Sequence, residues 1–120
     1  GTGHGVGYYM NVHEGPQAIS KNNRIKFKAG IVVSNEPGYY EKDNFGIRIE
    51  NLIYVKKEKR GKYFENLTIA PIDKDLIDKS FLNRKEKNWL NNYHKVVFNK
   101  LNKTMNKLEK LELKKACSAI

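Results

Sequence analysis

Two stretches, IVVSNEPGYY (residues 31–40) and GIRIENLIYV (residues 46–55), decide the fold that this sequence predicts. The first opens with a β-branched run, so we expect a strand there that ends near Pro37. The second alternates with a period of two, which predicts one long strand with an isoleucine and valine face. A charged turn over 56–62 and a returning hairpin strand over 63–70 would complete this strand-rich half.

The N-terminal stretch GTGHGVGYYMNVHEGP (residues 1–16) is rich in glycine and then apolar. Glycines at this density let a backbone pass close to a neighbouring segment, because they carry no Cβ. The apolar stretch that follows them can extend as a strand. We therefore expect this stretch to run beside another strand at close distance.

Beyond Pro71 the hydrophobic period becomes helical. The recurring apolar residues are Trp89, Tyr93, Val96, Val97 and Leu101, and Met105, Leu108 and Leu111 begin a second, lysine-rich helix. Asn83, with Glu86 three residues later, predicts a capping box at the start of the first helix. We expect Trp89, Tyr93 and Val97 to form its buried face.

Length and composition indicate one ordinary domain with an appended tail. The chain has 120 residues, of which 39% are hydrophobic, enough for a modest core. Its single cysteine, Cys117, can form no internal disulfide, which favours a reducing compartment. Neither a run of about 18 apolar residues nor a signal peptide is visible, so we expect a cytoplasmic location without a membrane partner. Because the first residue is Gly1, the sequence reads as a processed chain or a fragment.

The net charge of +10 raises nucleic acid as a partner, but the charge is unevenly placed. Residues 1–50 carry six basic and five acidic residues (net +1), whereas residues 84–120 carry ten and three (net +7). Four tail lysines recur at helical spacing, which is typical of a solvated helix face: Lys103, Lys107, Lys110 and Lys114. A nucleic-acid interface is disfavoured, since no aromatic residues interleave with these lysines after Phe98.

Five residues of the strand-rich half could carry chemistry. Imidazole and carboxylate groups ligate Zn²⁺, Mn²⁺ or Fe²⁺, and these groups are present at His4, His13, Glu36 and Glu50. Strand alternation places Arg48 and Glu50 on one face, where the arginine would keep the carboxylate ionised. Each residue also has a plainer explanation, because a histidine between glycines can sit in a turn and a strand glutamate is usually solvated.

Four segments, in this order within the first 51 residues, favour a functional role for these residues: GTGHGVG, NVHEGP, SNEPGYY and FGIRIEN. They closely resemble the second half of the catalytic domain of Xaa-Pro aminopeptidases, the "pita-bread" metallopeptidases related to prolidase and methionine aminopeptidase. The resemblance implies an α+β fold. Residues 1–70 would form the C-terminal half of a pita-bread domain with a curved antiparallel sheet, and residues 71–120 a C-terminal helical subdomain.

The resemblance also implies roles for the five residues. His4, Glu36 and Glu50 match ligands of two divalent cations, with Mn²⁺ favoured, and Glu50 matches the bridging carboxylate. Glu36 matches a carboxylate that also works as acid and base, Arg48 an arginine that orients the site, and His13 a histidine that contacts substrate. The implied activity is release of the N-terminal residue from peptides with proline second, in which the cations activate water.

The match is incomplete, because the family's two aspartate ligands and one further histidine have no counterpart in these 120 residues. We therefore expect the isolated chain to be inactive and its partner to be a missing N-terminal half. A homodimer is compatible with the sequence. The alternative from another class is a non-catalytic remnant or an interaction module, and the presence of an upstream segment separates the two.

Overall fold

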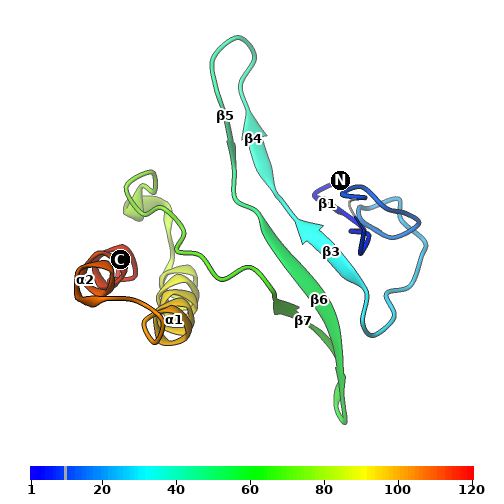
Figure 1. Ribbon diagram of the computed structural model, residues 1–120. Helices are drawn as coiled ribbons and strands as arrows, with labels where there is room; N and C mark the ends of the chain where they lie inside the picture. The colour runs from blue at the N-terminus through cyan, green and yellow to red at the C-terminus, as the bar shows by residue number, and fades with distance from the viewer. Residues whose placement is uncertain (10) are drawn as a thin grey trace. The chain divides into compact units, whose positions relative to one another are not determined.

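Antiparallel strands occupy the first part of the chain and helices the second part (Figure 1). The computed structural model describes residues 1–9 and 11–120. They divide into two units, Gly1–Thr68 and Ile69–Ile120. The predicted α+β class is confirmed, because the strands all lie in the first unit and both α-helices lie in the second.

The strands of the first unit pair only with antiparallel neighbours among the described residues. They are β1 (Gly3–His4), β2 (Ala18–Ile19), β3 (Val32–Asn35), β4 (Gly38–Tyr40), β5 (Gly46–Arg48), β6 (Asn51–Glu58) and β7 (Gly61–Asn66). The central sheet has the order β3-β6-β7, and β1-β2 and β4-β5 are two-stranded pairs. A β-bridge between Gly5 and Val33 joins the β1 segment to β3.

The long strand expected over 46–55 is two strands, β5 and β6. Asn35 pairs with Asn51, and Gly38 pairs with Arg48, so one register continues across the break. Figure 1 shows β4 and β5 as the continuation of β3 and β6. The ladder is interrupted because Pro37 has no amide hydrogen. The preceding residue, Glu36, donates its N–H to the carbonyl of Thr2.

The apolar face expected along 46–55 is buried in only one of these strands. In β6, Ile53 and Val55 are 6% and 3% exposed, whereas Ile47 and Ile49 are 44% and 47% exposed. Val33, which is fully buried, is the register partner of Ile53. The core of this unit therefore lies under β3 and β6, and the β4–β5 hairpin extends beyond it.

The turn between β6 and β7 is shorter than the charge pattern suggested. β6 continues through Glu58 and β7 starts at Gly61, so the charged turn over 56–62 is reduced to two residues between these strands. Lys56 lies within the ladder, and its ammonium is 2.9 Å from the carboxylate of Glu65 on β7. Opposite charges across an antiparallel pair stabilise it.

Among residues 5–9 and 11–16, which the structure describes, no strand forms where one was expected after the glycine-rich start. Tyr8 and Tyr9 form a bend with exposed side chains, and residues 12–13 form another bend. Met10 lies outside the described residues. The amide of Gly7 donates to the carbonyl of Asn11 at 2.9 Å.

The helical unit contains the short 3-10 helix η1 (Lys79–Phe81), then α1 (Arg84–Leu101) and α2 (Lys107–Ala116). The predicted capping box at α1 is confirmed, since Asn83 and Glu86 each accept a backbone N–H of the other. A second capping box begins α2, formed by Asn106 and Glu109. Of the lysines expected on one helix face, Lys103 precedes α2, and the other three are exposed on it.

The buried face of α1 is rotated from the one expected. Tyr93 and Val97 are 8% and 1% exposed and pack with Leu113 of α2, as predicted. Trp89, however, is 58% exposed and stacks on the Tyr93 ring at 5.7 Å. Its place is taken by Leu90, because the buried residues of α1 follow a helical stripe that passes beside residue 89: Leu90, Tyr93, His94 and Val97.

His94 connects the buried face of α1 to the segment that precedes the helices through a hydrogen bond. Its ring is fully buried, and Nε2 accepts the backbone N–H of Ile72 at 3.1 Å. Burial lowers the pKa of His94, and the nearby charge of Lys74 acts in the same direction. The hydroxyl of Tyr93 donates to the carbonyl of Ala70 at 2.8 Å. Residues 69–72 are thus held against α1 by two hydrogen bonds.

No helix among the described residues is long and apolar enough to cross a membrane.

The helical core supports a paired stability test. Val97→Ala should lower the free energy of unfolding by about 2 kcal/mol, because a fully buried side chain is truncated. Val96→Ala, one residue away and 52% exposed, should change it by less than about 0.5 kcal/mol. Urea unfolding followed by circular dichroism measures both. Equal effects from the two variants would contradict the packing of α1.

Candidate functional site

His4 reaches its position because glycines let β1 lie close against other backbone. A Cβ on Gly3 would meet the carbonyl oxygen of Ser34, and one on Gly5 would meet that of Glu14. Neither oxygen belongs to a flexible side chain, so neither can move aside cheaply. The glycine-rich start is therefore required by close approach, as its composition predicts.

The side chains of His4, Glu36 and Arg48 meet at the interruption of the ladder. His4 Nε2 lies 2.9 Å from Glu36 Oε1, and Arg48 Nη1 lies 2.7 Å from Glu36 Oε2. The Glu36 side chain is 15% exposed, against 25% for His4 and 48% for Arg48. The carboxylate is thus held at both oxygens, with the imidazole on one side and the guanidinium on the other.

Glu50 faces Glu36 across the interruption. Continuing the register from the Asn35 and Asn51 pair by one residue places Glu36 opposite Glu50. Two carboxylates directly opposite each other repel. Arg48 offsets this repulsion, because its Nη1 also lies 3.8 Å from Glu50 Oε2. The same face for Arg48 and Glu50, which strand alternation predicts, is what allows one guanidinium to contact both carboxylates.

Tyr40 and Ser34 complete the network, and sequence reasoning missed both. The Tyr40 hydroxyl accepts from Arg48 Nε at 2.8 Å, and the Ser34 hydroxyl donates to Glu36 Oε1 at 2.8 Å. A signal for Ser34 existed, since residues two apart on a strand share a face. Tyr40 follows the Pro-Gly pair of residues 37–38, where the strand pattern is broken, and carried no such signal.

The surroundings of Glu36 favour its ionised form. The hydrogen bond from Ser34 lowers the pKa of Glu36 most, and the positive charge of Arg48 and the imidazoles of His4 and His13 add to this against the opposing effect of burial. A carboxylate kept ionised and fixed at both oxygens is suited to bind a cation or to accept a proton.

The His4 ring is oriented by a second contact. Its Nδ1 lies 2.9 Å from the carbonyl oxygen of Gly5, which can only accept, so Nδ1 carries a proton. In a neutral ring the Nε2 lone pair then points at Glu36 Oε1. That arrangement calls for a positive centre between the two atoms, either a second proton on the ring or a bound cation.

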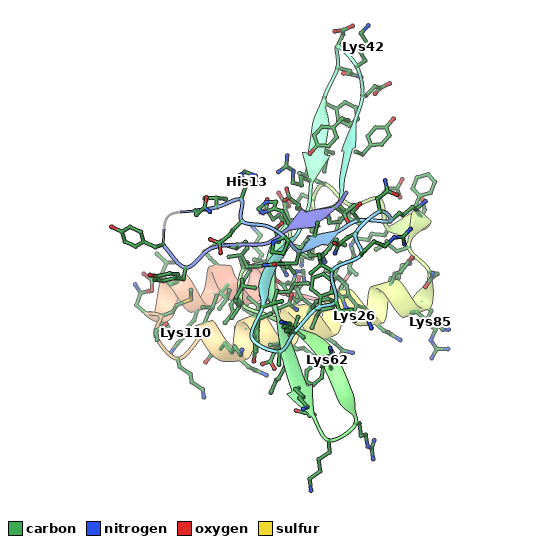
Figure 2. All side chains as sticks on the ribbon, turned by 90° about the vertical axis from the view of Figure 1, so that its right-hand side faces the viewer. His13, Lys26, Lys42, Lys62, Lys85 and Lys110 are labelled. Carbon is green, nitrogen blue, oxygen red and sulfur yellow. The ribbon has the colours of Figure 1, made fainter. Side chains whose placement is uncertain are left out.

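Figure 2 shows His13 on the loop that follows β1, and its ring lies beside that of His4. The two ring centroids are 4.2 Å apart, and His13 is exposed. The structure therefore brings together all five residues named from the sequence: His4, His13, Glu36, Arg48 and Glu50. Most of them border an open cleft of about 340 Å³, which is lined by Gly1, Thr2, Gly3, His4, Glu36, Gly38, Tyr40 and Arg48.

The donors fit a divalent cation in kind but are too few. One imidazole nitrogen and carboxylate oxygens suit Mn²⁺ or Zn²⁺. Across residues 1–9 and 11–120, however, no three histidine, cysteine, aspartate or glutamate side chains are grouped so that they could hold one ion. His4 and Glu36 supply two converging donors, and an ion held there would need further ligands.

Two family descriptions match nearly the whole chain. "Metallopeptidase family M24" matches residues 1–57, and "C-terminal region of peptidase_M24" matches residues 62–120. The boundary between the two matches falls near the end of the strand-rich unit.

Individual relatives agree with this match. The chain is 49% identical over 112 residues to a probable Xaa-Pro aminopeptidase P of Coprinopsis cinerea, covering 84% of this chain and 18% of that protein. It is 49% identical over 111 residues to aminopeptidase P2 of Arabidopsis thaliana, covering 84% of this chain and 16% of that protein. The chain therefore spans less than a fifth of the length of these relatives.

A solved structure resembles the whole chain. The crystal structure of X-prolyl aminopeptidase from Caenorhabditis elegans, described as a cytosolic enzyme with a di-nuclear active site, superposes with a TM-score of 0.83 at 39% identity. The superposition covers 100% of this chain and 21% of that one. The arrangement of strands and helices described above is thus one that a solved protein adopts.

The approach of β1 to β3 predicts a steric effect at Gly3. Gly3→Ala should lower the free energy of unfolding by about 1–3 kcal/mol, because the new methyl group would overlap the Ser34 carbonyl. Gly15→Ala is the matched control, since a Cβ at Gly15 meets nothing within 4 Å. Thermal melts of the two variants test this, and a stable Gly3→Ala variant would rule out the described contact.

The charge network predicts how stability depends on pH. The folded-state pKa of Glu36 lies below its ordinary value of 4.5, so its contribution is complete above that value and is lost as the pH falls through the folded-state pKa. Glu36→Gln should therefore lose less unfolding free energy on acidification than the original chain, because glutamine does not titrate. Unfolding free energies measured from neutral pH down to about pH 3 test it.

The control for that titration is Glu41→Gln, in the exposed turn between β4 and β5. This variant should keep the acid loss of the original chain. If Glu36→Gln and the original chain lost stability in parallel as the pH falls, Glu36 would not be held as an ion by its neighbours.

Proposed function

Because this chain belongs to metallopeptidase family M24 and corresponds to the C-terminal part of the Xaa-Pro aminopeptidases P, we propose that it supplies part of a peptidase active site. The reaction is release of the N-terminal residue from peptides that have proline second. The convergence of His4 and Arg48 on the two oxygens of Glu36 is the observation that carries this proposal.

His4, Glu36 and Glu50 are the residues of this chain that would hold two divalent cations, with Mn²⁺ favoured. When bound, such cations activate water and polarise the scissile carbonyl. Two observations support the fit. His4 Nε2 and Glu36 Oε1, both of which can donate a lone pair to a cation, lie 2.9 Å apart, and the register places Glu36 opposite Glu50. The remaining ligands would come from a segment outside these 120 residues.

Glu36 is proposed as the acid and base of the reaction. A general base must lie within hydrogen-bonding reach of the proton that it takes and must be ionised before it does so. Glu36 meets the second condition, because Ser34 and Arg48 both favour its charged form. After accepting a proton at a carboxylate oxygen, it would pass that proton to the departing proline nitrogen.

Arg48 and His13 are proposed to orient the site and the substrate. Arg48 holds the Glu36 carboxylate from the side opposite His4 and is itself held by Tyr40. His13 is exposed beside His4, which lines the cleft, and is accessible to a peptide carbonyl there. Neither residue needs to ligate a cation for these roles.

The domain assignment is part of the proposal. Residues 1–70 would be the second half of a pita-bread catalytic domain, whose curved sheet is completed by strands from elsewhere. Residues 71–120 would be the helical subdomain that follows it in the longer members of the family. A cytoplasmic location agrees with the description of the Caenorhabditis elegans enzyme as cytosolic. A homodimer is compatible with this assignment.

A second candidate is an interaction module without catalysis. It is favoured by the short ligand set and by the exposed apolar side chains of the β4–β5 hairpin, among them Tyr39, Phe45 and Ile47. The two functions differ in one respect that can be measured. Only the first predicts that a supplied upstream segment creates turnover.

The activity test follows from the missing ligands. With Mn²⁺, the chain alone should release no N-terminal residue from an Xaa-Pro tripeptide above the buffer rate. Refolding it with the upstream region of the Coprinopsis cinerea relative should produce release that a chelator abolishes. In that reconstituted enzyme Glu36→Gln should lower the rate by about 100-fold or more, and Glu41→Gln should not. Chelator-sensitive release by the chain alone would contradict the short ligand set.

A further inference from the structure

We propose that Ser34 is a positioning residue that fixes the distance between His4 and Glu36. The inference rests on the proposed function, since it concerns the two donors assigned to the cations. It is carried by three features of the structure: the complete burial of a hydroxyl, the two hydrogen bonds that it makes, and the separate strands that those bonds connect.

Ser34 stands where an apolar residue would be expected. It lies in the middle of β3 next to Val33, and both side chains are fully buried. A buried hydroxyl costs free energy unless it is hydrogen-bonded. Its presence at this position therefore needs a compensating set of bonds.

Those bonds engage the hydroxyl as donor and as acceptor. It accepts the backbone N–H of His4 at 3.0 Å and lies 2.8 Å from Glu36 Oε1. Among the described residues, the other acceptor within reach of its proton is the His4 carbonyl, at 3.5 Å. The ionised carboxylate is both closer and the stronger acceptor, so the proton goes to Glu36.

The two bonds couple elements that are far apart in sequence. His4 belongs to β1 and Glu36 follows β3, thirty-two residues later. One oxygen atom of Ser34 is bonded to the backbone of the first and to the carboxylate of the second. The hydroxyl therefore positions the backbone of His4 and the carboxylate of Glu36 relative to each other. In this way it fixes the 2.9 Å distance between His4 Nε2 and Glu36 Oε1.

Removal of the hydroxyl has two consequences. The backbone N–H of His4 loses its acceptor, and Glu36 Oε1 loses the hydrogen bond that it accepts from the buried side of the sheet. Groups that support metal ligands in this way typically change metal affinity by about 10- to 100-fold when they are removed. A role in stability alone would leave the affinity unchanged.

The test compares three variants of the full chain. Ser34→Ala removes the hydroxyl, and Ser34→Thr keeps it. Thr68→Val is the matched control, because the Thr68 hydroxyl also accepts a backbone N–H of the same sheet, that of Leu52 at 2.8 Å, and this bond involves neither His4 nor Glu36. All three are checked for folding by circular dichroism and thermal melting.

The first readout is Mn²⁺ affinity, measured by calorimetry with Mn²⁺ alone. Ser34→Ala should raise the Kd by about tenfold or more, whereas Ser34→Thr and Thr68→Val should stay within about twofold of the original chain. An unchanged Kd in Ser34→Ala, or an equal rise in Thr68→Val, would overturn the assignment.

The second readout needs no cation. The ring-nitrogen chemical shifts of His4 report its contact with Glu36, so they should move in Ser34→Ala and remain in Ser34→Thr and Thr68→Val. If the original chain binds no Mn²⁺, its short ligand set accounts for that result without touching the proposed function, and the ring shifts alone decide the role of Ser34. Unmoved shifts in a folded Ser34→Ala would overturn it.

Discussion

The register of one antiparallel ladder is the constraint on which the candidate site depends. It is fixed on both sides of Pro37, by the Asn35 and Asn51 pair and by the Gly38 and Arg48 pair. Since proline cannot donate to the ladder, the pairing opens between them at the position where two carboxylates are opposed. A slip by one residue would turn these side chains to the other face of the sheet. The site therefore exists only in this register.

Opposed carboxylates need positive partners, and the structure supplies them from different elements. Arg48 comes from the facing strand and His4 from the added strand β1, which glycines allow to lie against β3. Exposure rises from the fully buried Ser34 through Glu36 to the half-exposed Arg48. The carboxylate is thus fixed from the buried side and remains accessible from the cleft. This is the arrangement that a substrate or cation entering from solvent requires.

The local features of this chain could be predicted from its sequence. The capping box of α1 depends on two residues three apart, and the shared face of Arg48 and Glu50 depends on strand alternation, so both were confirmed. The burial of Val97 and the exposure of Trp89 could not be separated in this way. Both fit a helical period, and only the partner helix decides which stripe is covered. The same limit explains why Ile53 is buried and Ile47 is not.

The sequence by itself determined the class of fold, the five candidate residues and the family that they resemble, because residue type, order and spacing carry that information. Tertiary structure alone decided that Ser34 bonds both His4 and Glu36 and that Tyr40 holds Arg48. These contacts join residues up to thirty positions apart, and no local pattern encodes them. The physical reason is that a hydrogen bond depends on distances of a few tenths of an ångström, which only the packing of β1 against β3 can set.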